Sequence, residues 1–218
     1  MTWIGKWLPL FRFAGSADYW RKRYRWGGNS GAGSTGPAAA YKAQVLNGFV
    51  RRYGVRNVVE FGCGDGRQLQ LAEYPQYLGL DISPEAIALC RSRFSDDSSK
   101  RFELVGDYRG DVFDLALSLD VLFHLVEDNV YDDYLRRLFS VAQRYVVVYA
   151  TSSAVVKGTL SHVRHRPVEH DIRERFPGFM RMLEAEANLP GPVEHGEGGF
   201  TRFFLYRREG GMNESDSH

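Results

Sequence analysis

The clearest chemical motif in the sequence is a glycine-rich run with an acidic residue just before it. Residues 58–66 read VVEFGCGDG, an apolar stretch that contains Glu60 and leads into a G-x-G-x-G turn. Between a strand and a helix, such a turn lets the backbone approach a nucleotide closely. Arg67 stands where the dinucleotide fingerprint G-x-G-x-x-G needs its third glycine, and no Lys-Ser/Thr pair follows. This spacing disfavours an NAD-dependent dehydrogenase and excludes a nucleoside-triphosphatase loop.

Two further acidic residues follow the next two predicted strands. Asp81 ends the run YLGLD, where a carboxylate can accept hydrogen bonds from both hydroxyls of a ribose. Asp107 follows the run RFELVG and has Tyr108 beside it. We interpret Cys63, between two glycines, as a packing residue rather than a nucleophile. The acidic residues and the glycine turn together predict a nucleoside-binding crevice.

The elements that position these residues alternate between strands and helices, which indicates an α/β fold with a parallel sheet. Apolar runs of strand length alternate with helical patterns at residues 37–54, 67–74, 83–94 and 129–144. After residue 150 the pattern changes to a polar loop, a short helix at 168–176 and two predicted strands at 179–187 and 200–207. These last two strands are expected to form an antiparallel pair at one edge of the sheet.

The motifs VVEFGCGDG, YLGLDIS, LVGD and DLALSLDVLFHL, in this order and spacing, resemble those of class I S-adenosylmethionine-dependent methyltransferases. The resemblance covers about residues 38 to 208. It implies a doubly wound, seven-stranded, mostly parallel sheet of the Rossmann-like methyltransferase type with a C-terminal antiparallel hairpin. It also implies S-adenosylmethionine as cofactor, held by Glu60, Gly62, Cys63, Gly64, Gly66, Asp81, Ile82, Asp107, Tyr108 and Leu119.

The methyl acceptor is expected beside the fourth predicted strand, where Asp120 and His124 lie four residues apart. A hydroxyl acceptor must lose a proton near the time of attack, so His124 is the first candidate for a general base. The alternative is a histidine that only caps or packs. Amine-methylating nucleic-acid and protein members of the family that this sequence resembles often carry an Asn/Asp-Pro-Pro-Tyr-like run after the fourth strand. This sequence lacks the run, so the resemblance argues against the amino groups of nucleic-acid bases as acceptors.

A second polar cluster occupies residues 162–171. His162 and Arg164 are candidate acceptor contacts, and His165 is a second candidate base. A solvated, salt-bridged loop is an equally good interpretation. Asp120 and a histidine could together bind a divalent cation such as Mg²⁺, although no ligand spacing requires such a site.

Residues 1–36 form a distinct N-terminal segment. Residues 1–26 contain all four tryptophans and six Lys or Arg against one Asp, a charge of +5, and the run GGNSGAGSTG follows. We interpret the segment as a lid with residues 27–36 as its mobile hinge and Tyr24, Asn29, Ser30 and Ser34 as contacts. The alternatives are peripheral membrane contact or a homodimer contact. Residues 37–208 would form the methyltransferase domain, and residues 209–218 a disordered acidic tail.

Composition limits the remaining functions. A chain of 218 residues with a net charge of +1 fits one globular domain and does not favour a nucleic-acid partner. Two isolated cysteines, the lack of a clear signal peptide and the lack of a long apolar run indicate a cytoplasmic protein. The sequence thus predicts methyl transfer to a hydroxyl of a small polar acceptor, with a sugar or glycoside as the leading class. The alternatives are N- or O-methylation of another small metabolite and a non-catalytic, cofactor-binding scaffold for a partner protein.

Overall fold

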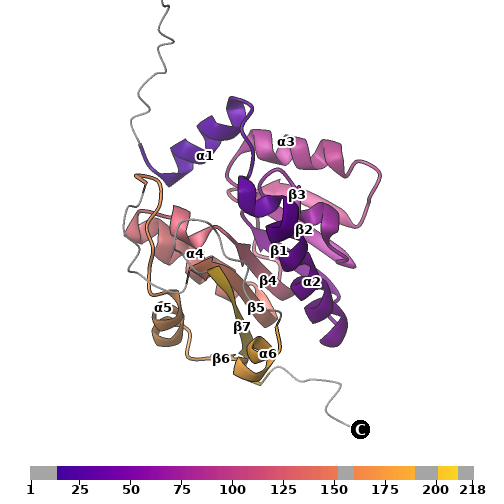
Figure 1. Ribbon diagram of the computed structural model, residues 1–218, viewed down its shortest axis with the longest axis vertical. Coiled ribbons are helices and arrows are strands. Elements are labelled where there is room, and N and C mark those ends of the chain that lie inside the picture. Colours follow the sequence, from indigo (N-terminus) through magenta and orange to yellow (C-terminus); the bar gives the residue numbers. More distant parts are fainter. Residues whose placement is uncertain (1–13, 152–159, 190–200, 211–218) are drawn as a thin grey trace, which may run out of the picture.

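A seven-stranded sheet forms the centre of the protein (Figure 1). The computed structural model describes residues 14–151, 160–189 and 201–210. The strand order is β3-β2-β1-β4-β5-β7-β6. The first five strands are parallel, and β7 runs antiparallel to both β5 and β6. The strands are β1 Asn57–Phe61, β2 Gln76–Asp81, β3 Lys100–Leu104, β4 Phe113–Leu119, β5 Ala142–Thr151, β6 Phe179–Arg181 and β7 Thr201–Arg208. This arrangement confirms the predicted mostly parallel sheet with antiparallel C-terminal strands.

Helices cover both faces of the sheet because successive strand residues point to opposite sides. In β1, Val58 packs into the hydrophobic cluster that contains Leu46 of α2, whereas Val59 packs into the cluster that contains Leu135 of α4. Ile172 of α5 joins the second cluster. The helices are α1 Ser16–Arg25, α2 Gly36–Arg52, α3 Pro84–Arg93, α4 Asp128–Ser140, α5 Val168–Arg175 and α6 Leu183–Ala187.

The C-terminal part corrects one predicted strand. The strand expected at 179–187 ends at Arg181, and residues 183–187 form the short helix α6. The ladder breaks because the Glu186 side chain, rather than a β6 carbonyl, accepts the hydrogen bond from the backbone N–H of Leu205 at 2.8 Å. Glu186 also pairs with Arg181. A carboxylate therefore substitutes for further strand pairing.

Two predicted helices are shorter than expected. The pattern at 129–144 predicted a helix through residue 144, but α4 ends at Ser140 and β5 begins at Ala142. The backbone carbonyl of Val141 already accepts a hydrogen bond from Phe113 N–H of β4, which starts the strand pairing early. The stretch at 67–74 forms only a 3₁₀ turn, Gln68–Leu71. The predicted disordered tail falls largely on residues 211–218, outside the described residues.

Candidate active site

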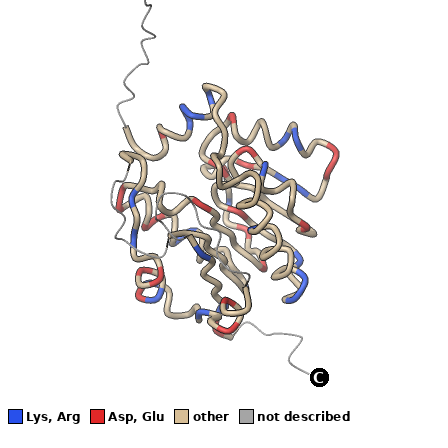
Figure 2. The backbone as a smooth tube through the Cα atoms, viewed as in Figure 1, with Lys and Arg blue, Asp and Glu red and all other residues tan. Residues whose placement is uncertain are grey.

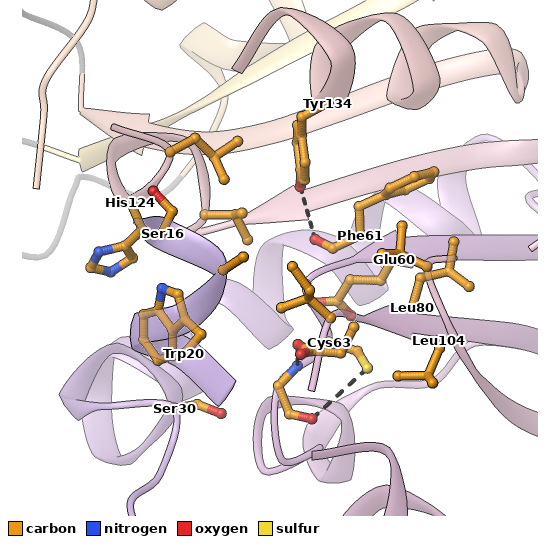
Figure 3. A pocket seen from close by; sticks show the side chains of 18 of the residues that line it. Ser16, Trp20, Ser30, Glu60, Phe61, Cys63, Leu80, Leu104, His124 and Tyr134 are labelled. Carbon is orange, nitrogen blue, oxygen red and sulfur yellow. Dashed lines mark hydrogen bonds between the residues drawn. The ribbon is translucent and has the colours of Figure 1, made fainter. Parts of the chain in front are cut away.

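A cavity of about 730 Å³ lies at the carboxyl ends of the parallel strands (Figure 3). Its walls come from the loops after β1, β2, β3 and β4, from α4, and from α1 and α2 at the N-terminal side. Eight of the ten expected cofactor residues line it, namely Glu60, Gly62, Cys63, Gly64, Asp81, Ile82, Asp107 and Leu119. The sheet thus brings the dispersed sequence motifs to one site.

Gly66 and Tyr108 lie outside this lining. Gly66 has φ +74°, and a Cβ there would come within 3.0 Å of Cys90 Sγ, so this glycine lets the loop pack on α3. Tyr108 packs edge-on against Phe61, with 6.2 Å between ring centroids, and its hydroxyl donates to the Asp111 carbonyl. In this structure Gly66 therefore packs against α3 and Tyr108 packs against Phe61, and neither residue lines the cavity.

The backbone N–H groups of the glycine loop donate hydrogen bonds to acceptors within the protein. The N–H groups of Gly62 and Cys63 donate to the Leu80 carbonyl at 2.7 and 3.0 Å, and that of Gly64 donates to Asp81 Oδ2 at 3.0 Å. The next three N–H groups donate to Ser30 Oγ, the Cys63 carbonyl and Asp65 Oδ1, respectively. A loop that binds a pyrophosphate presents its N–H groups to the ligand. This loop therefore fits a nucleoside without phosphates better than a dinucleotide.

Two buried carboxyl groups, those of Glu60 and Asp81, line the cavity. Burial raises the pKa of Glu60 to about 7, although the hydrogen bond from the Tyr77 hydroxyl at 2.7 Å and the nearby Lys42 oppose the shift. Burial also raises the pKa of Asp81, which accepts hydrogen bonds from the backbone N–H groups of Gly64 and Ser83. Such groups suit a ligand that carries a sulfonium, an ammonium and ribose hydroxyls.

Lys42 of α2, a cation that is only 1% exposed, is a cavity residue that was not predicted from the sequence. Its Nζ donates to Asp120 Oδ2 at 2.5 Å, and both residues line the cavity. Its position in the sequence could have indicated its burial, because Lys42 shares one face of the helix with the buried residues Val45, Leu46 and Phe49. Acids are therefore not the only charged groups in the cavity.

His124 lies in the cavity and is held in one tautomer. Its Nδ1 lies 3.2 Å from the carbonyl oxygen of His162. A carbonyl only accepts, so Nδ1 carries the proton and Nε2 is the basic nitrogen. Burial lowers the pKa of His124 to about 4, which keeps the ring neutral near pH 7. Trp20 packs edge-on against the ring at 4.9 Å (Figure 3).

The candidate site residues of the second polar cluster lie outside the cavity lining. His165 Nδ1 is 2.8 Å from Thr151 Oγ1, and Arg164 donates to the Val126 carbonyl and pairs with Asp128. His162 stacks on Tyr19 of α1 at 4.2 Å. Within this cluster, His162 therefore contacts both His124 and α1, and the role of His165 as a base stays a prediction.

Helix α1 forms part of the cavity wall through Ser16, Trp20 and Tyr24. The backbone N–H and hydroxyl of Ser16 donate to the carboxylate of Glu127 at 2.8 and 2.6 Å. Although burial opposes it, these bonds lower the pKa of Glu127. The start of α1 is thus fastened to the segment that precedes α4.

The glycine-rich segment 27–36 is folded against the site, and its predicted role as a hinge stays a prediction. Ser30 Oγ donates to Asp65 Oδ1 at 2.8 Å and lies 2.9 Å from the Tyr24 hydroxyl. Ser34, at the end of a 3₁₀ turn, lines the cavity. Asn29 does not line it, and its side chain accepts a hydrogen bond from Gly31 N–H.

A metal site gains no support from the part of the chain that the structure describes. No group of three or more His, Cys, Asp or Glu side chains there could hold a metal ion. Asp120, the candidate ligand, pairs with Lys42 instead of a histidine. Within the same residues, no helix is long and apolar enough to cross a membrane.

Comparisons with known proteins agree with this geometry. A family model described as "Methyltransferase domain" matches residues 59–145. No curated protein sequence matches the chain. Among solved structures, N-methyltransferase NodS from Bradyrhizobium japonicum WM9, in complex with S-adenosylhomocysteine, is similar at 14% identity and a TM-score of 0.66 over 89% of this chain and 99% of that one.

A second similar structure is magnesium protoporphyrin IX methyltransferase from Synechocystis PCC 6803 with bound S-adenosylhomocysteine. It shares 19% identity and a TM-score of 0.60 over 88% of this chain and 93% of that one. At these identities the structural similarity concerns the fold, while the family model matches the sequence from Val59 through His124 to Tyr145. The chain therefore has the Rossmann-like methyltransferase fold, and its residues 59–145 match a methyltransferase-domain family model.

Proposed function

We propose that this protein transfers a methyl group from S-adenosylmethionine to a hydroxyl of a small polar acceptor, with a sugar or glycoside as the leading class. The observation that carries the proposal is the position of His124, a neutral imidazole of fixed tautomer in the same cavity as the acidic nucleoside side. The cofactor supplies an activated methyl group on its sulfonium. Glu60, Asp81, Asp107 and the glycine loop would bind it.

In this proposal His124 takes the proton of the acceptor. Nε2 carries the lone pair, and the depressed pKa keeps it unprotonated well below pH 7. Hydroxyl acceptors need this help most, because an amine is already nucleophilic when neutral. Trp20 and the rest of α1 would shield the reacting groups from water.

An amine of a small metabolite is the second candidate acceptor. The observation that favours it is the similarity of the fold to NodS, which is described as an N-methyltransferase. An amine would use the same cofactor residues and would depend less on His124. The two candidates therefore differ in the role of one side chain.

Calorimetric titration of the full chain tests the cofactor first. S-adenosylmethionine and S-adenosylhomocysteine are expected to bind, and NAD is not, because the N–H groups of the glycine loop already have acceptors. Failure of both sulfur nucleosides to bind would overturn the proposal. Labelled S-adenosylmethionine offered with sugars, phenols and amines would then identify the acceptor, and binding without any transfer would favour the scaffold alternative.

A further inference from the structure

The orientation of the His124 ring depends on a segment far along the chain. His124 belongs to residues 121–128, between β4 and the first turn of α4, and its hydrogen-bond partner His162 belongs to residues 160–167, before α5. The bond from Nδ1 to the His162 carbonyl measures 3.2 Å, so a further separation of roughly 0.4 Å would break it. The tautomer of the ring therefore depends on contacts that hold these two segments together.

Alternate residues of the 160–167 segment make those contacts. The backbone N–H of Arg164 donates to the Phe123 carbonyl at 2.7 Å. The side chain of His165 instead bonds to Thr151 at the end of β5. Alternate residues of an extended chain point to opposite sides. The residues that contact the 121–128 segment are accordingly His162, Arg164 and Arg166.

Arg166 bonds to the 121–128 segment through both ends of its guanidinium. Nη2 donates to the carbonyls of Leu125 and Val126 at 3.3 and 3.0 Å, and Nη1 donates to Asp128 Oδ1 at 2.5 Å. The residue is only 9% exposed, and its guanidinium carbon lies 4.4 Å from the ring centroid of Tyr131 in α4. A planar guanidinium can hold several acceptors in one fixed geometry, which a lysine ammonium cannot.

The burial of Arg166 is unfavourable unless its contacts are needed. Among the residues that the structure describes, its Nε–H has no hydrogen-bond partner, and a buried donor without a partner is destabilising. An apolar side chain could fill the space beside Tyr131 without burying a charge. The segment that Arg166 holds also contains Glu127, which binds the start of α1. Arg166 is thus placed to fix both His124 and the helix that packs on it.

We propose that Arg166 is a positioning residue for His124: it fixes the 121–128 segment against the 160–167 segment, which keeps the ring proton on Nδ1 and leaves Nε2 as the basic nitrogen. Arg166 does not line the cavity, so it acts through His124 rather than on a ligand. The inference rests on the proposed function, because the fixed tautomer serves catalysis only if His124 is the base.

Nuclear magnetic resonance of the full chain measures the tautomer directly, since ¹⁵N shifts report which ring nitrogen is protonated. The His124 signal is the one that disappears in His124→Gln. In wild type we expect the Nδ1–H tautomer and a pKa of about 4. In Arg166→Met we expect both tautomers and a pKa above about 5, because burial is the main cause of the lowered value and a loosened segment admits water.

Arg175→Met is the matched control. This exposed arginine lies over the same Tyr131 ring, 5.8 Å from its centroid, but bonds to Asp132 of α4. Its replacement removes a charge from the same ring and should leave the His124 tautomer unchanged. Arg166→Lys keeps the charge and loses the planar fork, so it should give an intermediate mixture of tautomers. It also serves if the methionine variant does not fold.

Calorimetry with S-adenosylhomocysteine separates positioning from general loss of structure. All three variants should bind it within about threefold of wild type, because the cofactor residues lie outside the segments that Arg166 joins. Loss of this affinity in Arg166→Met, in parallel with the change at His124, would mean that Arg166 only stabilises the fold and would overturn the inference.

Two further outcomes would also contradict the positioning role. One is a single Nδ1–H tautomer with the wild-type pKa in Arg166→Met. The other is wild-type behaviour in Arg166→Lys, because the charge rather than the geometry of the side chain would then be what matters. If wild type does not bind S-adenosylhomocysteine, the proposed function fails, while the tautomer measurement still decides the role of Arg166.

Discussion

Glu60 and His124 line one cavity, and burial shifts their pKa values in opposite directions, to about 7 and about 4. Both shifts favour the uncharged form, because desolvation penalises a carboxylate and an imidazolium alike. Lys42 and Asp120 form a direct ion pair in the same cavity. The cavity thus holds one ion pair and two groups whose pKa values burial shifts toward the neutral form.

Replacing His124 by glutamine tests the proposed base. We expect turnover with a hydroxyl acceptor to fall about 100-fold, as loss of general-base catalysis implies, while calorimetry shows the affinity for S-adenosylhomocysteine unchanged. His165→Gln is the control, because that imidazole lies outside the cavity lining. Equal turnover in the His124→Gln variant and wild type would favour an amine acceptor.

The His124→Gln variant should also change how the free energy of unfolding depends on pH. Between pH 6.5 and about 4 the unfolded state binds a proton at His124 more readily than the folded state, whose pKa is about 4. The contribution of His124 to the free energy of unfolding is therefore fully present above pH 6.5 and is lost as the pH falls toward 4. Denaturant titrations should show a shallower loss over this interval in His124→Gln than in wild type.

At the scale of elements, α1 depends on a residue far along the chain for its first turn. Gly15 precedes the helix and provides no side-chain cap, so the Glu127 carboxylate takes over that role for the N–H and hydroxyl of Ser16. A carboxylate at a helix N-terminus is also favoured by the helix dipole. The segment before α4 thereby fixes the position of Trp20.

We expect Ser16→Ala to loosen α1 by about 1 kcal/mol, the typical loss for a capping interaction. Hydrogen exchange of the amides in residues 16–25 measures this change. Asp18→Ala, which removes only a surface pair with Lys22, should leave exchange nearly unaltered. Unchanged exchange in Ser16→Ala would mean that ring contacts such as Tyr19 with His162 hold the helix without Glu127.

The elements that the sequence predicted well are those with a strong periodic pattern. The buried runs that became β1, β2 and β4 and the amphipathic pattern of α2 are local signals, and the resemblance arranged them correctly. The strand 179–187 failed because a side chain, Glu186, interrupts the ladder. Lys42 was missed because its partner, Asp120, is 78 positions away, and only the fold brings the two together.

At the scale of the whole molecule, the N-terminal segment contributes no residue to either hydrophobic cluster of the described chain. Both hydrophobic clusters consist of buried residues between Tyr41 and Tyr206. Figure 2 shows both acidic and basic positions on α1 and over the rest of the fold, in keeping with a net charge of +1. The membrane and dimer interpretations depend partly on residues 1–13, which lie outside the described residues, and both stay predictions.

Removal of residues 1–35 is expected to keep the sheet and weaken the site. The truncated chain should retain a cooperative thermal transition, because neither hydrophobic cluster loses a member. Its affinity for S-adenosylhomocysteine should fall at least about tenfold, since Ser30 no longer bonds to Asp65 beside the glycine loop. Removal of residues 1–13 alone is the control. A truncated chain that binds normally would show that α1 and the segment 27–36 serve another purpose.

The placement of tryptophan gives the protein an optical reporter. All four tryptophans lie within residues 1–26, so indole emission originates only from the N-terminal segment. Trp20 lines the cavity and packs on His124, and a ligand that enters would change its surroundings directly. Fluorescence of the unlabelled protein can therefore follow occupancy of the cavity in real time, with Trp20→Phe identifying the share of the signal that belongs to the site.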